Sequence, residues 1–173
     1  MTGYTLFDTA IGRCGIAWND AGITGVQLPQ PNDAQTRTRL FQRSGGDVIE
    51  SDPPPAIARA IDGMVRLLSG QKVDLTGPAL DMTHVPVFNR GVYDIAREIP
   101  PGRTLTYGDI AKRLGGVQLS RDVGQALGQN PFPVIVPCHR VLAAGGKLGG
   151  FSANGGVKTK LRMLGIEGAA VNH

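Results

Sequence analysis

Residues 106–128 read TYGDIAKRLGGVQLSRDVGQALG, and this stretch decides the fold that we predict for the second half of the chain. Thr106 and Ser120 are residue types that cap the start of a helix, because their hydroxyl groups accept a bond from a free backbone N–H. The Gly115-Gly116 pair between them suits a tight turn. Apolar residues recur at helical spacing after each cap, at Ile110, Ala111 and Leu114 and then at Val123, Ala126 and Leu127. The stretch predicts a helix-turn-helix, which occurs in DNA-binding proteins and also in purely structural settings.

Further elements are predicted around this pair. Short strands are expected over 5–7, 15–18, 23–28 and 72–75, with a turn at 19–22 that suggests a small antiparallel sheet. Helices are expected from Asn32 or Asp33 to Gly45, from Pro54 to Gly70, and from Val85 to Ile99. We expect a mixed α/β (α+β) fold, with an amino-terminal α/β domain over 1–80 and a mostly helical domain over 81–173.

Composition limits the class of protein. The 173 residues, 41% of them hydrophobic, are enough for one substantial core or two small ones. No apolar run approaches the roughly 20 residues that span a bilayer, and residues 1–4 lead into no export signal, so we expect a soluble, cytoplasmic protein. The two cysteines are too few for a disulfide framework, and with the three histidines they form no metal-ligand spacing. We therefore expect no metal and no cofactor.

Charge is unevenly distributed along the chain. Residues 1–80 hold 7 Lys and Arg against 8 Asp and Glu, whereas residues 81–173 hold 11 against 6. The second half is therefore a candidate nucleic-acid surface, because phosphate contacts need clustered positive charge. A solvated basic face without a nucleic-acid partner is an equally good explanation of the charge alone.

A candidate nucleophile follows the apolar, strand-like stretch 132–136, in the run Pro137-Cys138-His139-Arg140-Val141. A free cysteine has a pKa of about 8.5 and is mostly protonated at neutral pH, unless a neighbouring base or positive charge shifts it. Histidine can act as that base. Adjacent Cys138 and His139 can cooperate only if the backbone turns sharply between them, and Pro137 suits such a turn.

The PCHRV run resembles the active-site signature of the O6-alkylguanine-DNA alkyltransferases, also called methylated-DNA-protein-cysteine methyltransferases. Other blocks keep the order of that family: IPPG at 99–102, TYG at 106–108, SRDVG at 120–124, NP at 130–131, GFS at 150–152 and LGIEG at 164–168. A weaker match, FDTAIG at 7–12, resembles the first strand and turn of the family. The resemblance implies an RNase H-like amino-terminal domain that gives structural support, and a winged helix-turn-helix domain that binds DNA and accepts the alkyl group.

The resemblance also implies the reaction. An alkyl group passes directly and irreversibly from O6-alkylguanine in double-stranded DNA to Cys138, so that each molecule reacts once; O4-alkylthymine is a further candidate substrate. The target nucleotide must first be flipped out, because the alkyl group lies within the base stack. The implied protein is a monomeric, single-turnover methylated-DNA-[protein]-cysteine S-methyltransferase whose partner is damaged DNA and not a membrane.

The resemblance assigns roles to five catalytic residues. Glu167 holds His139, which acts through a water molecule on the thiol of Cys138. Tyr107 bonds a ring nitrogen of the flipped guanine and helps the leaving oxygen to gain a proton. Asn130 ties the active-site turn to the helix-turn-helix. Without the resemblance, a tyrosine at a helix start usually packs and a glutamate near the end of a chain is usually solvated.

Two further groups of residues follow from the resemblance. The DNA-binding group is Arg121, which fills the gap left by the flipped nucleotide, with Gly124, Gln125 and Gly128, which let the second helix approach the DNA backbone. The substrate-binding group is Val141, Phe151, Ser152 and Lys160, in which the serine bonds the lesion oxygen and the carbonyls of Cys138 and Val141 receive the guanine amino group. Phe151 replaces a usual tyrosine, and 152–156 is about two residues longer than in familiar members. These differences leave open the adduct size and the contribution of Lys158 or Lys160.

Two other classes of function remain open at this point. An alkyltransferase-like protein binds alkylated DNA without transfer, although such proteins lack the reactive cysteine that Cys138 provides here. A thiol hydrolase could use Cys138, His139 and Glu167, but it would turn over repeatedly and would have no use for Arg121. Arg140 is expected to brace the fold more than to catalyse.

Overall fold

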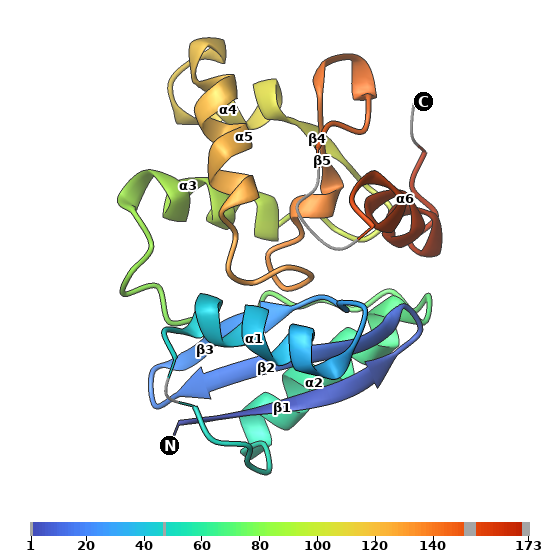
Figure 1. The fold of residues 1–173 in the computed structure, drawn as a ribbon. Helices are drawn as coiled ribbons and strands as arrows, with labels where there is room; N and C mark the ends of the chain where they lie inside the picture. The colour runs from blue at the N-terminus through green and yellow to red at the C-terminus, as the bar shows by residue number, and fades with distance from the viewer. Residues whose placement is uncertain (1, 47, 151–154, 171–173) are drawn as a thin grey trace. The chain divides into compact units, whose positions relative to one another are not determined.

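The structure is a computed structural model that describes residues 2–46, 48–150 and 155–170 (Figure 1). The chain forms two compact units. The amino-terminal unit comprises residues 1–84 together with 131–135, and the carboxy-terminal unit comprises 85–130 and 136–173. Among the described residues, no helix is long and apolar enough to cross a membrane.

The amino-terminal unit is built on the predicted antiparallel sheet. Its strands are β1 (Gly3–Thr9), β2 (Gly12–Asn19) and β3 (Gly22–Gln27), which pair in the order β1-β2-β3. The turn between β2 and β3 is closed by Asn19, whose side-chain oxygen accepts bonds from the backbone N–H groups of Ala21 and Gly22. Gly22 has a φ of 141°, and a Cβ there would lie 2.5 Å from the carbonyl oxygen of Ala79, so only glycine fits.

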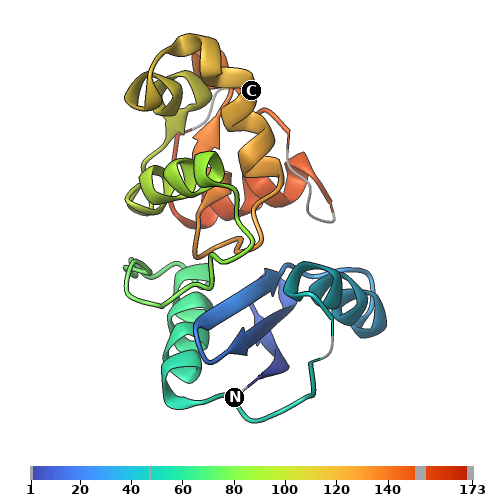
Figure 2. The same ribbon diagram turned by 90° about the vertical axis from the view of Figure 1, so that its left-hand side faces the viewer.

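Two helices cover opposite faces of this sheet, α1 (Asp33–Ser44) and α2 (Pro55–Leu68), as Figures 1 and 2 show. Their bounds confirm the predicted helices to within two residues. Asn32 caps α1 by accepting a bond from the N–H of Gln35, and Gly45 ends it in the left-handed conformation. The core between these layers consists largely of fully buried side chains, among them Ile16, Trp18, Ile23, Leu40, Met64 and Leu67.

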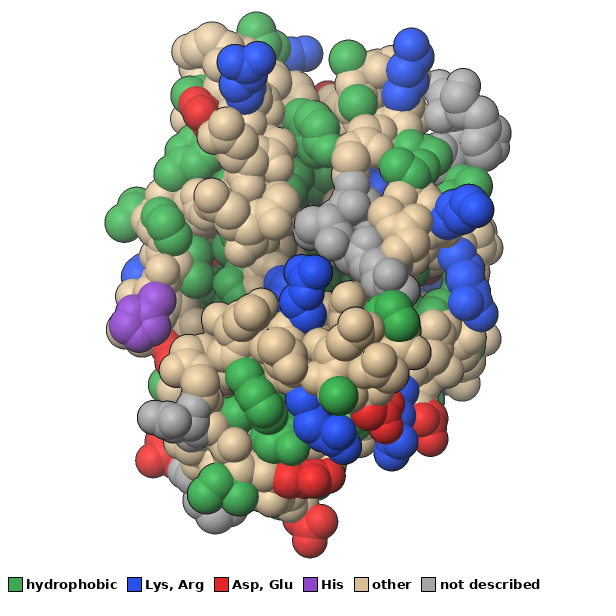
Figure 3. Space-filling view, viewed as in Figure 1, with side chains coloured by type: hydrophobic (Ala, Val, Ile, Leu, Met, Phe, Trp, Pro, Cys, Tyr) green, Lys and Arg blue, Asp and Glu red, His purple; other side chains and the backbone are tan. Residues whose placement is uncertain are grey.

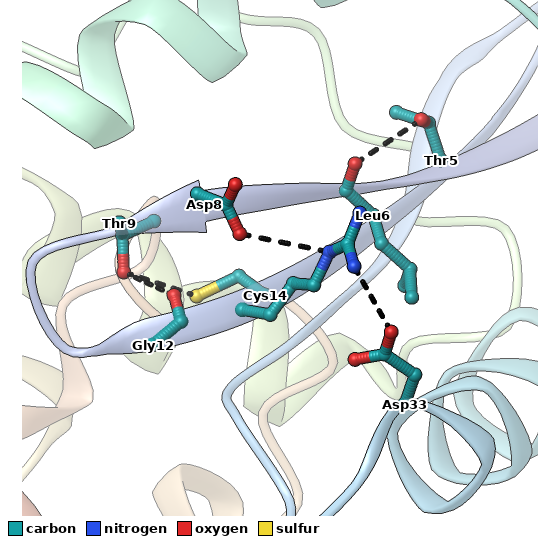
Figure 4. A network of polar contacts seen from close by, with 8 residues as sticks. Thr5, Leu6, Asp8, Thr9, Gly12, Cys14 and Asp33 are labelled. Atoms are coloured by element: carbon teal, nitrogen blue, oxygen red, sulfur yellow. Dashed lines mark hydrogen bonds and ion pairs between the residues drawn. The ribbon is translucent and has the colours of Figure 1, made fainter.

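Polar contacts join the start of β2 to its neighbours (Figure 4). The guanidinium of Arg13 lies 3.6 Å from a carboxylate oxygen of Asp8 and 3.0 Å from one of Asp33, which links the hairpin to α1. Cys14 is fully buried beside Thr9, and burial raises the pKa of its thiol to about 12. Cys14 is therefore a packing residue and not a nucleophile.

The predicted strand at 72–75 is wrong, because residues 71–75 have no regular structure. Leu75 packs instead against α2, where a Cβ on Gly63 would lie 2.8 Å from its side chain. The outer edge of β3 forms backbone hydrogen bonds with residues 79–81. The N–H of Ile23 donates to the carbonyl of Ala79, and the N–H of Asp81 donates to the carbonyl of Ile23.

The carboxy-terminal unit contains the predicted helix-turn-helix. Its helices are α3 (Val87–Arg97), α4 (Tyr107–Leu114) and α5 (Ser120–Gly128), with a 3-10 turn, η1 (Val117–Leu119), before the last. Thr106 caps α4 and exchanges bonds with Asp109 in a capping box. The prediction that Ser120 caps α5 is wrong, since η1 makes Leu119 the cap, and the hydroxyl of Ser120 donates to the carbonyl of Val117 instead.

Several short elements of this unit were not predicted. A parallel pair joins β4 (Leu105–Thr106) to β5 (Val141–Leu142), and helix α6 (Val157–Ile166) follows two 3-10 turns, η2 (Cys138–Arg140) and η3 (Ala144–Gly146). In the segment 131–135, which belongs to the amino-terminal unit, the predicted strand-like stretch 132–136 is wrong, because Val134 takes a φ of 77° within a turn. A β-branched residue in that conformation is strained, so tertiary packing overrides its preference for a strand.

Candidate active site

Cys138 lies just after a tight reversal of the backbone. Pro137 has a φ of −79° and a ψ of 67°, and the N–H of Cys138 donates to the carbonyl of Val136 across 2.7 Å. These values describe an inverse γ-turn centred on the proline. The carbonyl of Val136 also accepts a bond of 2.8 Å from the side-chain amide of Asn130, which follows α5. The turn is therefore fastened to the end of the helix-turn-helix. The sharp turn was expected between Cys138 and His139, whereas the γ-turn lies one residue earlier, at Pro137, and Cys138–Arg140 form a 3-10 turn.

A buried network begins at the next residue. The imidazole of His139 is fully buried, and its Nε2 lies 2.9 Å from Oε2 of Glu167 at the end of α6. Arg140 grips the same carboxylate with two bonds, from Nε at 2.9 Å and from Nη2 at 2.8 Å, while its Nη1 donates to the carbonyl of Ile99. The carboxylate of Glu167 is thus shared between a cation and an imidazole.

The electrostatics of this network define the protonation state of each group. Burial alone would raise the pKa of Glu167, but bonds from His139 and Arg140 outweigh it and lower the pKa to about 2. Burial lowers the pKa of His139, and the charges of Arg140 and Lys160 lower it further, against the opposing effect of Glu167. At neutral pH we therefore take Glu167 as ionised and His139 as neutral.

The tautomer of His139 follows from these states. An ionised carboxylate only accepts hydrogen bonds. Nε2 of His139 therefore carries the proton and donates a hydrogen bond to Glu167. Nδ1 then holds the free lone pair. This atom is buried and has no hydrogen-bond partner among the described residues. The nitrogen that can act as a base is therefore Nδ1, which belongs to the residue directly after Cys138.

Cys138 lies in the wall of a cavity of about 300 Å³. The described residues that line it are Tyr107, Gly124, Leu127, Gly128, Cys138, Gly150 and Lys160. Three of these are glycines, and among the described residues a Cβ on Gly128 or Gly150 would meet no atom within 4 Å apart from its chain neighbours. Burial, and the negative charge of Cys138, raise the pKa of Tyr107, which keeps its hydroxyl protonated as a donor.

The cavity brings together many of the residues predicted from the sequence. Tyr107 begins α4, while Gly124 and Gly128 come from α5 and Lys160 from α6. Arg121 and Gln125 are exposed on α5 and do not line the cavity. Val141 is buried in β5, and its carbonyl accepts a bond from Lys160. Phe151 and Ser152 lie outside the described residues.

Two features of the site were missed by sequence analysis. The pair of hydrogen bonds from Arg140 to Glu167 joins residues 27 positions apart, and no local pattern in the sequence signals this contact. The burial of Lys160, which is 1% exposed, was also not predicted from the sequence. Its position on the apolar face of α6, next to Met163 and Leu164, is the signal that could have shown it.

Comparison with known proteins connects this geometry to a family. Residues 87–169 match the family described as the DNA binding domain of 6-O-methylguanine DNA methyltransferase. The chain is 36% identical over 157 residues to a methylated-DNA--protein-cysteine methyltransferase of Methanothermobacter thermautotrophicus, a match that covers 91% of this chain and 80% of that protein. The chain belongs to this methyltransferase family. A second member, a methylated-DNA--protein-cysteine methyltransferase of Mycolicibacterium paratuberculosis, is 31% identical to this chain, and the match covers 96% of this chain and 93% of that protein.

Solved structures of methyltransferases are similar in fold as well. The O6-methylguanine methyltransferase of Mycobacterium tuberculosis superposes with a TM-score of 0.75 at 30% identity, covering 97% of this chain and 93% of that one. Its complex with DNA superposes with a TM-score of 0.72 at 31% identity, covering 95% of this chain and 92% of that one. The mixed α/β fold with a small antiparallel sheet, predicted from the sequence, is confirmed.

Proposed function

We propose that this methyltransferase-family chain removes the alkyl group from O6-alkylguanine in double-stranded DNA and keeps it on Sγ of Cys138. The single observation that carries the proposal is the placement of Cys138 in a cavity wall directly before His139, whose Nε2 is held by Glu167. Such a set can generate a thiolate beside a space open to a ligand. The names of the similar proteins, which are methyltransferases of this specificity, support the same substrate.

The thiol is activated by the buried network. His139 removes the proton from Cys138 at Nδ1, through a bridging water molecule, and becomes a cation. Glu167 stabilises that cation through Nε2, and Arg140 keeps the carboxylate ionised and in position. The thiolate is the reactive form of cysteine.

The chemical step is a displacement at the alkyl carbon. The sulfur–carbon bond forms as the carbon–O6 bond breaks, and the electron pair stays on the guanine, which takes up a proton with the help of Tyr107. The product on the protein is a thioether, which none of the described residues is placed to break, so each molecule reacts once. Asn130 positions the turn that presents the thiol.

DNA binding is assigned to the helix-turn-helix of the carboxy-terminal unit. The matched DNA binding domain begins at residue 87 and includes α4 and α5. Figure 3 shows more Lys and Arg than Asp and Glu side chains over this unit on the face in view, which suits a phosphate backbone. Exposed Arg121 occupies the gap left by the flipped guanine, while Gly124, Gln125 and Gly128 allow close approach of α5 to the DNA.

Substrate contacts complete the proposal. The carbonyl of Val141 lies next to Lys160 and is proposed to receive the guanine amino group, with Phe151 and Ser152 assigned to the base and the lesion oxygen. The amino-terminal domain, predicted over 1–80, is proposed to act as structural support, and the domain over 81–173 is proposed to bind DNA and accept the alkyl group. The protein is proposed to act as a monomer, as the resemblance to the family implies.

The direct test is incubation with duplex DNA that carries O6-methylguanine, followed by mass spectrometry of the cysteine peptides. One methyl group is expected on the peptide of Cys138 and none on that of Cys14, which is fully buried. Cys138→Ala should abolish the transfer, and Cys14→Ala is the matched control that should retain it. Repeated turnover of an ester or peptide substrate, with no methylated cysteine, would instead indicate a thiol hydrolase.

A further inference from the structure

Helix α3 buries a polar side chain on the face that packs against α5. The buried residues of α3 are Asn89, Val92, Tyr93 and Ala96, and Asn89 is 7% exposed. Its Nδ2 donates a hydrogen bond of 3.0 Å to Oε1 of Gln129, which lies 40 positions further along the chain. An apolar side chain in this place would avoid the cost of burying an amide, so a contribution other than stability is indicated for Asn89.

Gln129 lies between the last residue of α5 and Asn130. Its backbone N–H continues the hydrogen bonding of the helix by donating to the carbonyls of Gln125 and Ala126. Its side chain belongs to an exposed residue and reaches back to α3 through the bond to Asn89. The bond from Asn89 therefore restrains the residue that directly precedes Asn130.

Asn130 connects this restraint to the turn that presents the thiol. Its N–H donates to the carbonyl of Leu127 at 3.2 Å, which holds the residue against the end of α5. Its side-chain amide donates to the carbonyl of Val136 at 2.8 Å, and the N–H of Cys138 donates to the same carbonyl at 2.7 Å. Every step from Asn89 to Cys138 is thus a hydrogen bond or a stretch of one or two residues of chain.

We propose that Asn89 is a positioning residue for Cys138, because it restrains Gln129 and thereby the orientation of Asn130, which holds the γ-turn. The inference rests on the proposed function for the reaction that the thiol performs, but the geometry of the turn does not require DNA. Asn89 is not among the described residues that line the thiol cavity, so it acts through the chain at the end of α5.

The same end of α5 also forms part of the cavity wall. Leu127 and Gly128, which directly precede Gln129, line the cavity that holds Cys138. A shift at Gln129 would therefore move the wall and the turn together. Such shifts matter for a displacement reaction, because a misplacement of about 1 Å can cost about 10²-fold in rate.

A second bond between the same two helices offers an internal comparison. Tyr93 lies one helical turn after Asn89 on α3, and its hydroxyl donates to the carbonyl of Ala126 at 2.6 Å. This bond ends within α5 and not at the residue next to Asn130. Its loss should weaken the packing of the helices without releasing the segment that leads to the thiol.

The experiment measures two rates of Cys138 modification, one by saturating duplex DNA that carries O6-methylguanine and one by iodoacetamide, which needs no DNA. Asn89→Leu and Gln129→Met each remove the bond with little change in side-chain volume. Each should slow both rates by about tenfold or more and leave the affinity for DNA unchanged. Gln129→Glu keeps an acceptor for Asn89 and should retain both rates, and Tyr93→Phe is the matched control that should also retain them.

A merely structural role for Asn89 would lower the free energy of unfolding and leave both rates unchanged, and that result would overturn the inference. Gln129→Met tests the same bond at an exposed position if Asn89→Leu does not fold. The combined variant should be no slower than either single one, since both remove one bond, and additive losses would contradict the positioning role. A wild-type protein that reacts with iodoacetamide but not with methylated DNA would refute the proposed function, while the iodoacetamide rates of the variants would still decide whether Asn89 positions the thiol.

Discussion

Arg140 and Glu167 form a two-pronged ion pair inside the carboxy-terminal unit, with both bonds between 2.8 and 2.9 Å and with both side chains almost wholly buried. The same carboxylate holds Nε2 of His139. The Arg140–Glu167 contact therefore contributes to the stability of the fold and also positions the carboxylate that holds His139, the proposed base.

Replacement of Arg140 by Met should destabilise the protein strongly. The change removes both Arg140 bonds from the buried carboxylate of Glu167, and breaking one side of a buried pair costs about 3–5 kcal/mol. The free energy of unfolding in urea measures the loss. Arg66→Met is the control, because Arg66 pairs with Asp62 on the surface of α2, and exposed pairs contribute about 0.2–1 kcal/mol. Equal losses in the two variants would contradict the buried network.

Stability should fall in acid through the same network. The pKa of Glu167 is lowered from 4.5 to about 2, so its contribution is fully present above pH 4.5 and is lost as pH falls towards 2. His139 also has a lowered pKa, so its contribution is present above its ordinary value of 6.5 and declines as pH falls below it. Wild-type melting temperatures between pH 7 and pH 2 should fall more steeply than those of Glu167→Gln. Parallel curves for the two proteins would show that Glu167 is not the group responsible.

Tyr107→Phe should slow methyl transfer with little loss of stability. Tyr107 lines the cavity, and its hydroxyl is proposed to help protonate the leaving guanine, an effect of about 10²–10⁴-fold for general acids. Tyr93→Phe is the contrasting variant, because its buried hydroxyl donates 2.6 Å to the carbonyl of Ala126 between α3 and α5. That change should cost about 1 kcal/mol of stability and leave the transfer rate intact. Single-turnover kinetics and urea unfolding separate the two outcomes.

Arg121→Ala should weaken repair of duplex DNA more than reaction with free O6-benzylguanine. Arg121 is exposed at the start of α5, and its proposed task is to fill the stack after the nucleotide flips, which a free base does not require. Arg39→Ala, an exposed arginine of α1, is the matched control and should alter neither rate. Equal losses of Arg121→Ala on both substrates would remove its role in flipping.

Local sequence patterns determined most of the secondary structure. The caps at Asn32 and Thr106 and the glycine after α1 act within a few residues, so their effects can be read from a short stretch. The apolar spacing of the helix-turn-helix and the inverse γ-turn at Pro137 belong to the same class. The adjacent Cys138 and His139 also needed no tertiary information to be recognised as a candidate nucleophile and base.

Tertiary structure alone decided which distant residues become hydrogen-bond partners and neighbours in the site. The carboxylate of Glu167 reaches His139 and Arg140 across about 27 residues of chain, and Lys160 enters the wall of the thiol cavity only because α6 packs against the turn that bears Cys138. Packing likewise overrode local preference at 72–75 and at Val134. Spacing and propensity act over a few residues, whereas burial and charge depend on which distant segments share a core, so these partners became apparent only in the folded chain.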